Sequence, residues 1–218
     1  MTAPPIGART YVLLAVLTLV AGYGDAVAFF GFGVFTANMT GNTVLLGGAI
    51  AGRIFGALPG DIGVALPFVS LATFVAGAIA AAVLLRGRAN VRRSTLWLLS
   101  TVAALLAATA FLQRDHASRT LLVALLSGVM GLQSLLAVRS GVGGVSTTYV
   151  TGTIVHAVDT LLGPRERDRR ARSEGRANAA VWALYLSGAF AGAAGLRLAG
   201  AGALWVPAAM VALLTAVV

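Results

Sequence analysis

Two short polar stretches carry most of the side chains in this sequence that could bind a solute. One reads TANMTGNTV (residues 36–44), the other reads STTYVTGT (146–153), and apolar residues flank both. Such groups can coordinate a solute or satisfy broken backbone inside a membrane. Alternatively, the Thr and Asn side chains only hold helices together. The candidate binding residues are Asp25, Asn38, Thr40, Gly41, Asn42, Gln133, Thr147, Thr148, Thr151 and Gly152.

Three ionisable residues lie in or beside apolar segments. Asp25 ends the first apolar run, and a carboxylate at membrane depth costs about 2.5–3.5 kcal/mol, so it should face protein or water. It is a candidate for proton coupling or solute binding; the alternatives are an interfacial position or the capping of a loop amide. His156 and Asp159 are one helical turn apart and could relay protons, unless Asp159 simply faces the following arginine-rich loop.

The sequence lacks the motifs that would indicate an enzyme. It contains no cysteine and no G-x-S-x-G, HExxH, Walker A or dinucleotide-binding pattern. Only two histidines are present, so we expect no metal site and no cofactor. All 16 basic residues are arginines and the net charge is +9. Because these arginines lie between apolar segments, they indicate membrane topology rather than nucleic-acid binding.

Composition and hydropathy place the chain among helical membrane proteins. Its residues are 58% hydrophobic and only 11% charged. Apolar segments cannot leave backbone groups unpaired in lipid, so they must be helices. The first resembles a signal peptide, but it runs into the polar stretch that recurs later, so we expect it to be retained. The segments cover 10–30, 36–51, 61–85, 94–112, 120–138, 146–162, 177–196 and 201–218.

An internal repeat divides the chain into halves, residues 1–112 and 113–218, within one transmembrane domain. The stretch 36–52 aligns without gaps on 147–163, with identical Thr, Gly and Val positions, and Gly77 then aligns with Gly188. A two-residue gap brings Gln133 and Ser134 onto Gly24 and Asp25. Chance matching of small residues is the alternative explanation.

Arginine distribution predicts which segments cross the membrane. The loops 86–93 and 163–176 are rich in arginine, so both should be cytoplasmic. An even number of crossings must separate them, so segment 146–162 should enter and leave on one side. By the repeat, 36–51 does the same. The N-terminus is then cytoplasmic, and all but four arginines lie inside. The alternative is that all eight segments span the membrane, which divides the arginines less unevenly between the two sides.

The predicted architecture therefore has six transmembrane helices and two re-entrant half-helices in two inverted repeats. In the first half, Gly31 and Gly33 would turn the chain after a span ending near Phe30. Five extended residues reach about 17 Å, enough to return to mid-depth. Thr36 or Asn38 would cap the half-helix that runs back out. The two half-helix N-termini would meet halfway through the bilayer.

The motifs resemble a known family. GYGDAVAFF, TANMTGNTVLLG, GLQS (131–134) and GGVSTTYVTGT closely resemble the YoaK-like bacterial membrane proteins, over nearly the whole chain. The resemblance implies about six spans and no established substrate. The family pattern has Asn after GLQ, where this chain has Ser134, so no Asn-specific role carries over.

Together these patterns predict a transporter or channel for a small polar or anionic solute in the bacterial inner membrane. The two Thr/Asn/Gly motifs would form its central site. The lipid bilayer is the other partner, and glycine-rich segments allow homo-oligomers. The alternative is a membrane sensor, a ligand- or lipid-binding scaffold, or a subunit of a larger complex.

Overall fold

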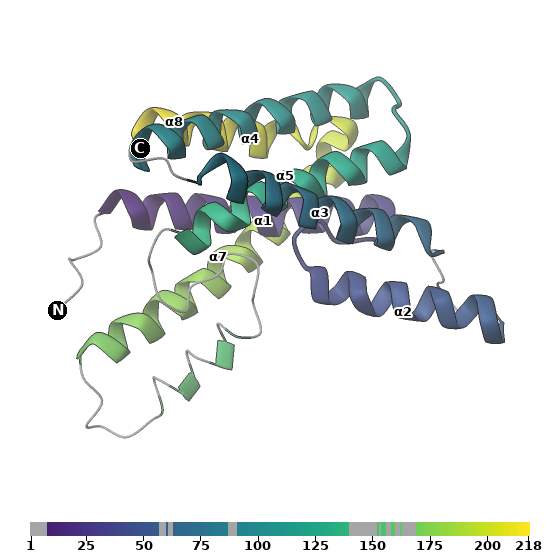
Figure 1. Cartoon of the computed structure of the whole chain (residues 1–218), viewed down its shortest axis with the longest axis horizontal. Coiled ribbons are helices and arrows are strands. Elements are labelled where there is room, and N and C mark those ends of the chain that lie inside the picture. Colours follow the sequence, from purple (N-terminus) through teal and green to yellow (C-terminus); the bar gives the residue numbers. More distant parts are fainter. Residues whose placement is uncertain are drawn as a thin grey trace.

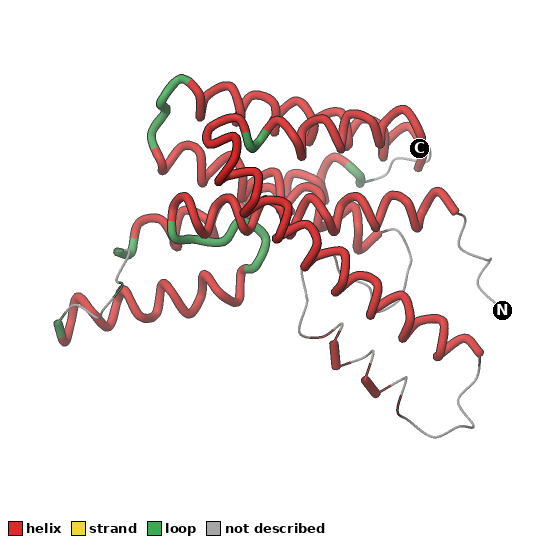
Figure 2. The backbone as a smooth tube through the Cα atoms, turned by 180° about the vertical axis from the view of Figure 1, so that it is seen from behind, coloured by secondary structure: helices red, strands yellow, loops and turns green. Residues whose placement is uncertain are grey.

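The described part of the chain is built from α-helices joined by short connections, and no strand occurs in it (Figure 2). The computed structural model describes residues 8–56, 60, 63–86, 91–139, 152, 154, 155, 158, 159, 162 and 169–218. The predicted all-α class is confirmed. The elements are α1 (Ala8–Phe32), α2 (Met39–Phe55), α3 (Ala65–Leu84), α4 (Val91–Arg114), α5 (Arg119–Arg139), α7 (Arg169–Ala199), the 3₁₀ turn η1 (Gly200–Gly202) and α8 (Trp205–Val217).

Five of these described helices, α1, α3, α4, α5 and α7, are long and apolar enough to cross a membrane. The protein is therefore a multi-pass membrane protein. Helix α8 is apolar but has only 13 residues. Helix α2 has 17 residues, or about 25 Å, so the prediction of a short second segment is confirmed. The helix begins at Met39, directly after the predicted cap Asn38, and it continues to Phe55, four residues beyond the predicted end of the segment at residue 51.

Helices α1 and α5 form the centre of the bundle. In the apolar stretch of α1, 72% of the residues are buried, and in that of α5, 61%. The corresponding values for α3, α4 and α7 are 22%, 33% and 17%, so these helices lie outside with broad faces left for lipid. Figure 1 shows α7 beside α1, α3 beside α5, and α8 beside α4, in agreement with the contacts between these elements.

Glycines allow the two closest helix pairs to touch backbone to backbone. A Cβ atom on Gly22 of α1 would lie 2.1 Å from the carbonyl oxygen of Tyr185 in α7. A Cβ atom on Gly131 of α5 would lie 2.0 Å from the carbonyl oxygen of Phe74 in α3. No side chain fits at such distances. In lipid, this kind of close packing by small residues replaces the hydrophobic effect as the force that holds helices together.

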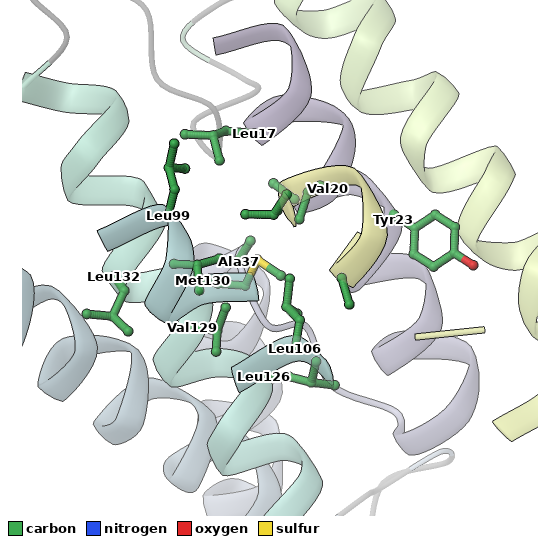
Figure 3. Close-up of a cluster of buried hydrophobic side chains, with 14 of the residues drawn as sticks. Leu17, Val20, Tyr23, Ala37, Leu99, Leu106, Leu126, Val129, Met130 and Leu132 are labelled. Atoms are coloured by element: carbon green, nitrogen blue, oxygen red, sulfur yellow. The ribbon is translucent and has the colours of Figure 1, made fainter. Parts of the chain in front are cut away.

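Large apolar side chains fill the space between the central helices and α4 (Figure 3). Leu17, Leu99, Leu106, Leu126 and Met130 are fully buried there. Ala37, which precedes α2, belongs to the same cluster and is 3% exposed. The segment that leads into α2 is therefore part of the protein core, which is an unusual position for a non-helical connection.

The path of the chain around α2 is visible in Figure 1. Helix α1 runs along the bundle, the chain then turns back, and α2 starts beside the middle of the molecule. From there α2 runs outward to the end of the bundle at which α1 finishes and α3 begins. The first polar motif thus lies at the inner end of a short helix.

Candidate functional site

A single glycine reverses the chain after α1. Gly33 has φ +81°, in the left-handed region that favours glycine, and its N–H donates to the Phe29 carbonyl at 2.9 Å. The first span ends near Phe30, as predicted, and α1 continues two residues further to Phe32. Gly31 is consequently helical and takes no part in the reversal.

Asp25 holds the returning segment inside the bundle. Its Oδ1 accepts hydrogen bonds from the backbone N–H groups of Thr36 at 2.7 Å and Ala37 at 2.6 Å, and from the Thr36 hydroxyl at 3.3 Å. Its Oδ2 accepts from the hydroxyl of Tyr185 in α7. The residue is 3% exposed. Four donors thus satisfy a carboxylate that would otherwise be very costly to bury.

These contacts fix the depth to which the chain returns. Asp25 lies seven residues before the end of α1, which corresponds to about 10 Å along the helix axis. The return is therefore shorter than the 17 Å that a fully extended segment would allow. The inner end of α2 lies below the end of α1 by about two helical turns.

Asn38 and Thr36 have different roles at the start of α2. Asn38 is the N-cap residue, and its side-chain oxygen accepts a hydrogen bond from the N–H of Gly41 at 3.2 Å. Thr36 is fully buried and points its hydroxyl to Asp25. Of the two predicted capping residues, Asn38 is thus the one that caps.

Asn42 joins α2 to two other helices. Its Oδ1 accepts from the N–H of Phe35 at 2.9 Å, and its Nδ2 donates to the Phe35 carbonyl at 2.7 Å and to the Ser70 hydroxyl at 2.8 Å. The hydroxyl of Ser70, in α3, also lies 2.7 Å from that of Ser127 in α5. This network pairs both backbone groups of the partly buried Phe35, and the Ser70 hydroxyl gives its carbonyl a second donor at 2.7 Å.

Gly41 and Thr40 complete the first motif. A Cβ atom on Gly41 would lie 2.7 Å from the ring of Phe35, which in turn stacks on Phe29 at a centroid distance of 4.6 Å. Gly41 therefore makes room for an aromatic side chain. Thr40 was also predicted to line the site, but it is exposed, so its side chain faces outward.

Gln133 and Ser134 carry buried polar atoms that the described part of the chain leaves without a hydrogen-bond partner. Gln133 is fully buried, and its Nε2 donates to the Leu17 carbonyl at 3.5 Å, while its Oε1 is unpaired there. The Oγ of Ser134 is also buried and unpaired there. Buried polar atoms almost always have a partner, so these two atoms mark a place where water or a ligand is expected.

Most of the second motif lies outside the described residues. Thr147, Thr148, Thr151 and His156 fall there, so their predicted roles stay predictions. The remaining two candidates are described. Gly152 and Asp159 are helical, and Asp159 is exposed.

Sequence reasoning missed Tyr185, Ser70 and Ser127. Tyr185 lies 160 residues from its partner Asp25, and Ser70 lies 57 residues from Ser127. Each lies between apolar neighbours in its helix, and nothing local distinguishes it from a hydroxyl bonded to its own helix. The repeat offered one signal for Tyr185, because it aligns with Phe74 at the same offset as Gly77 with Gly188.

Comparisons with known proteins agree with this membrane architecture. The family described as "Protein of unknown function (DUF1275)" matches residues 13–217. The chain is also 35% identical over 161 residues to "UPF0700 transmembrane protein YoaK" of Bacillus subtilis (strain 168), covering 69% of this chain and 67% of that protein. No solved structure matches. Because the match covers nearly the whole of this chain, the chain belongs to the DUF1275 family of membrane proteins, whose function is unknown.

Proposed function

We propose that this protein is a transporter or channel for a small polar solute, with its site between two inverted repeats. The observation that carries the proposal is the inner end of α2, which Asp25 holds inside the bundle about 10 Å below the end of α1. Broken helices at membrane depth are tolerated where protein or a cavity surrounds them, and in transporters they form the solute site.

Matching backbone contacts support the inverted repeats. Gly77 of α3 approaches the carbonyl of Gly128 in α5, and Gly188 of α7 approaches that of Leu19 in α1. Gly77 and Gly188 are 111 residues apart, whereas Leu19 and Gly128 are 109 apart. The contacts of Gly22 with Tyr185 and of Gly131 with Phe74 repeat the same two offsets. Helices α1 and α5 then align with the two-residue shift that places Ser134 opposite Asp25.

The sixth span in this proposal is α8 with the turn before it. Residues 200–218 together are close to the length of about 20 that a span needs. With six spans, Arg9, Arg86 and Arg139 lie on the cytoplasmic side, and Arg53 and Arg114 lie outside, as the charge rule requires. In this proposal the protein spans the bacterial inner membrane, and its N-terminus lies in the cytoplasm.

The asymmetry between Asp25 and Ser134 refines the choice of solute. In the first half, the Asp25 carboxylate already accepts hydrogen bonds from the backbone N–H groups that precede α2. In the second half, the equivalent Ser134 carries no charge, and its Oγ has no partner in the described part of the chain. The positive end of the second half-helix would thus be uncompensated. The proposed solute, neutral or anionic, therefore binds beside Gln133 and Ser134. Thr147, Thr148 and Thr151, which lie outside the described residues, stay its predicted further contacts.

One observation favours the alternative of a non-transporting scaffold, sensor or subunit of a larger complex. Both side-chain groups of Asn42 and both oxygens of Asp25 are paired within the protein. The first motif therefore needs no solute to satisfy it. Neither function assigns a catalytic residue to this chain.

Solute-driven swelling of proteoliposomes separates the two functions. We expect vesicles that contain the full chain to swell faster than empty vesicles with at least one of urea, glycerol, sodium formate or sodium nitrate. Ser134→Ala and Thr151→Ala should slow that flux about 10-fold or more, as the loss of buried solute contacts predicts. Thr43→Ala is the matched control, since the exposed Thr43 hydroxyl bonds only its own helix. Swelling rates equal to those of empty vesicles throughout would favour the scaffold.

A further inference from the structure

A cavity with three arginines lies at one end of the bundle, away from the first polar motif. Its volume is about 590 Å³. Arg9 at the start of α1, Arg92 at the start of α4 and Arg139 at the end of α5 line it. Figure 1 shows these helix ends gathered at the same end of the molecule, together with the end of α8.

The lining has a charged rim and a largely apolar interior, to which Thr10, Ser94 and Thr95 add hydroxyl groups. The three arginine side chains are exposed, whereas Leu13 and Leu136 beneath them are buried. No Asp or Glu is present among the described residues that line the cavity. Arg92 is anchored at the wall, where its Nε donates to the backbone oxygen of Val218 at 3.2 Å. Three positive charges thus converge, and no Asp or Glu side chain in the described wall neutralises them.

The depth of the cavity in the membrane follows from the helices that form it. Arg9 and Arg92 are second residues of apolar helices, and Arg139 is the last residue of another. Arginines at the ends of spanning helices lie at the level of the lipid headgroups. The rim is therefore at headgroup depth, and Leu13 and Leu136 lie at the level of the acyl chains.

We propose that this cavity binds an anionic phospholipid. Guanidinium groups bind phosphate oxygens through paired hydrogen bonds, and basic pockets between transmembrane helices suit acidic headgroups. A phospholipid matches both parts of the lining, because its phosphodiester meets the arginines and its acyl chain covers the leucines. An inorganic anion would leave the apolar interior empty. The site is independent of the proposed transport function.

Lipid titration of the purified full chain tests the proposal. We expect native mass spectrometry to record binding of phosphatidylglycerol about 10-fold tighter than binding of phosphatidylcholine. The triple variant Arg9→Gln, Arg92→Gln, Arg139→Gln should lose that preference. The matched control changes Arg53, Arg114 and Arg119 to Gln at the opposite helix ends and should keep it.

Two further measurements decide the remaining outcomes. Arg139→Lys keeps the charge but loses the two parallel hydrogen bonds of a guanidinium group, so it should weaken binding of phosphatidylglycerol severalfold. This conservative variant also serves as the test if the triple variant does not fold. Equal loss of preference in both triple variants would overturn the proposal, since it would indicate net charge alone. So would binding of inorganic phosphate at the arginines without any preference among lipids.

Discussion

Asp25 is the residue on which the position of α2 most depends. Replacing it with Ala would leave the amides of Thr36 and Ala37 and the hydroxyl of Tyr185 without their acceptor. Each buried donor left unpaired costs about 1–3 kcal/mol. We expect Asp25→Ala to lower the Tm of the protein in detergent by about 10 °C. Tyr185→Phe removes a single donor and should produce a smaller fall.

The matched control for this prediction is Asp115→Ala. Asp115 is an exposed carboxylate in the connection between α4 and α5. Its replacement should leave the Tm within about 2 °C of wild type, as surface substitutions usually do. Equal losses for the two aspartates would mean that Asp25 does not hold the returning segment.

Asn42 allows a second test at the scale of single residues. Asn42→Ala would leave the N–H of Phe35 without its acceptor, whereas the Phe35 carbonyl keeps the Ser70 hydroxyl at 2.7 Å, so we expect a loss of about 1–3 kcal/mol in unfolding free energy. Thr43→Ala, one position along the helix, should change it by less than about 0.5 kcal/mol. Unfolding in urea-containing detergent solution, followed by Trp fluorescence, measures both.

At the scale of helices, glycine positions determine how closely α1 and α7 approach. A methyl group on Gly22 would lie 2.1 Å from a backbone carbonyl oxygen that cannot move independently of its helix. We expect Gly22→Ala to force the helices apart and cost about 2–4 kcal/mol. Gly47→Ala should instead be neutral or stabilise by up to about 1 kcal/mol, because nothing lies within 4 Å of its added Cβ.

Thermal unfolding of the two glycine variants in the same detergent compares these positions directly. Both glycines are helical, so helix propensity favours Ala in each case. A difference in sign between the two changes in Tm therefore reports packing alone. A stabilising Gly22→Ala would contradict the close contact.

Hydropathy predicted the helices whose apolar residues face lipid or the core. It did not predict helix ends, which depend on capping and helix propensity, or contacts between helices far apart in sequence. Asn38 was a predictable cap because an amide side chain stands directly before the helix. The start of α7 at Arg169, rather than at 177, was missed, because hydropathy does not report the helix propensity of Arg and Ala. The Tyr185–Asp25 contact depends on two helices far apart in sequence, and no local pattern encodes it.

For the whole molecule, the central question is whether α2 crosses the membrane. A short helix that starts beside Asp25 and ends at Phe55 should return to the side where α1 ends. Since the chain contains no cysteine, single cysteines can report the side of each connection. The informative positions are Ala8 before the first span, Arg53 at the end of α2, Arg86 after α3 and Asp115 after α4.

The proposed topology predicts two groups of labels with a membrane-impermeant maleimide on intact spheroplasts. Arg53→Cys and Asp115→Cys should react from outside, whereas Ala8→Cys and Arg86→Cys should react only after the membrane is opened. If α2 crossed instead, Arg53→Cys would join Ala8→Cys inside and Arg86→Cys would react from outside. Detergent-solubilised protein, in which all four positions should react, controls for burial. Because each result assigns Arg53 to one side, the experiment decides between a re-entrant and a spanning α2.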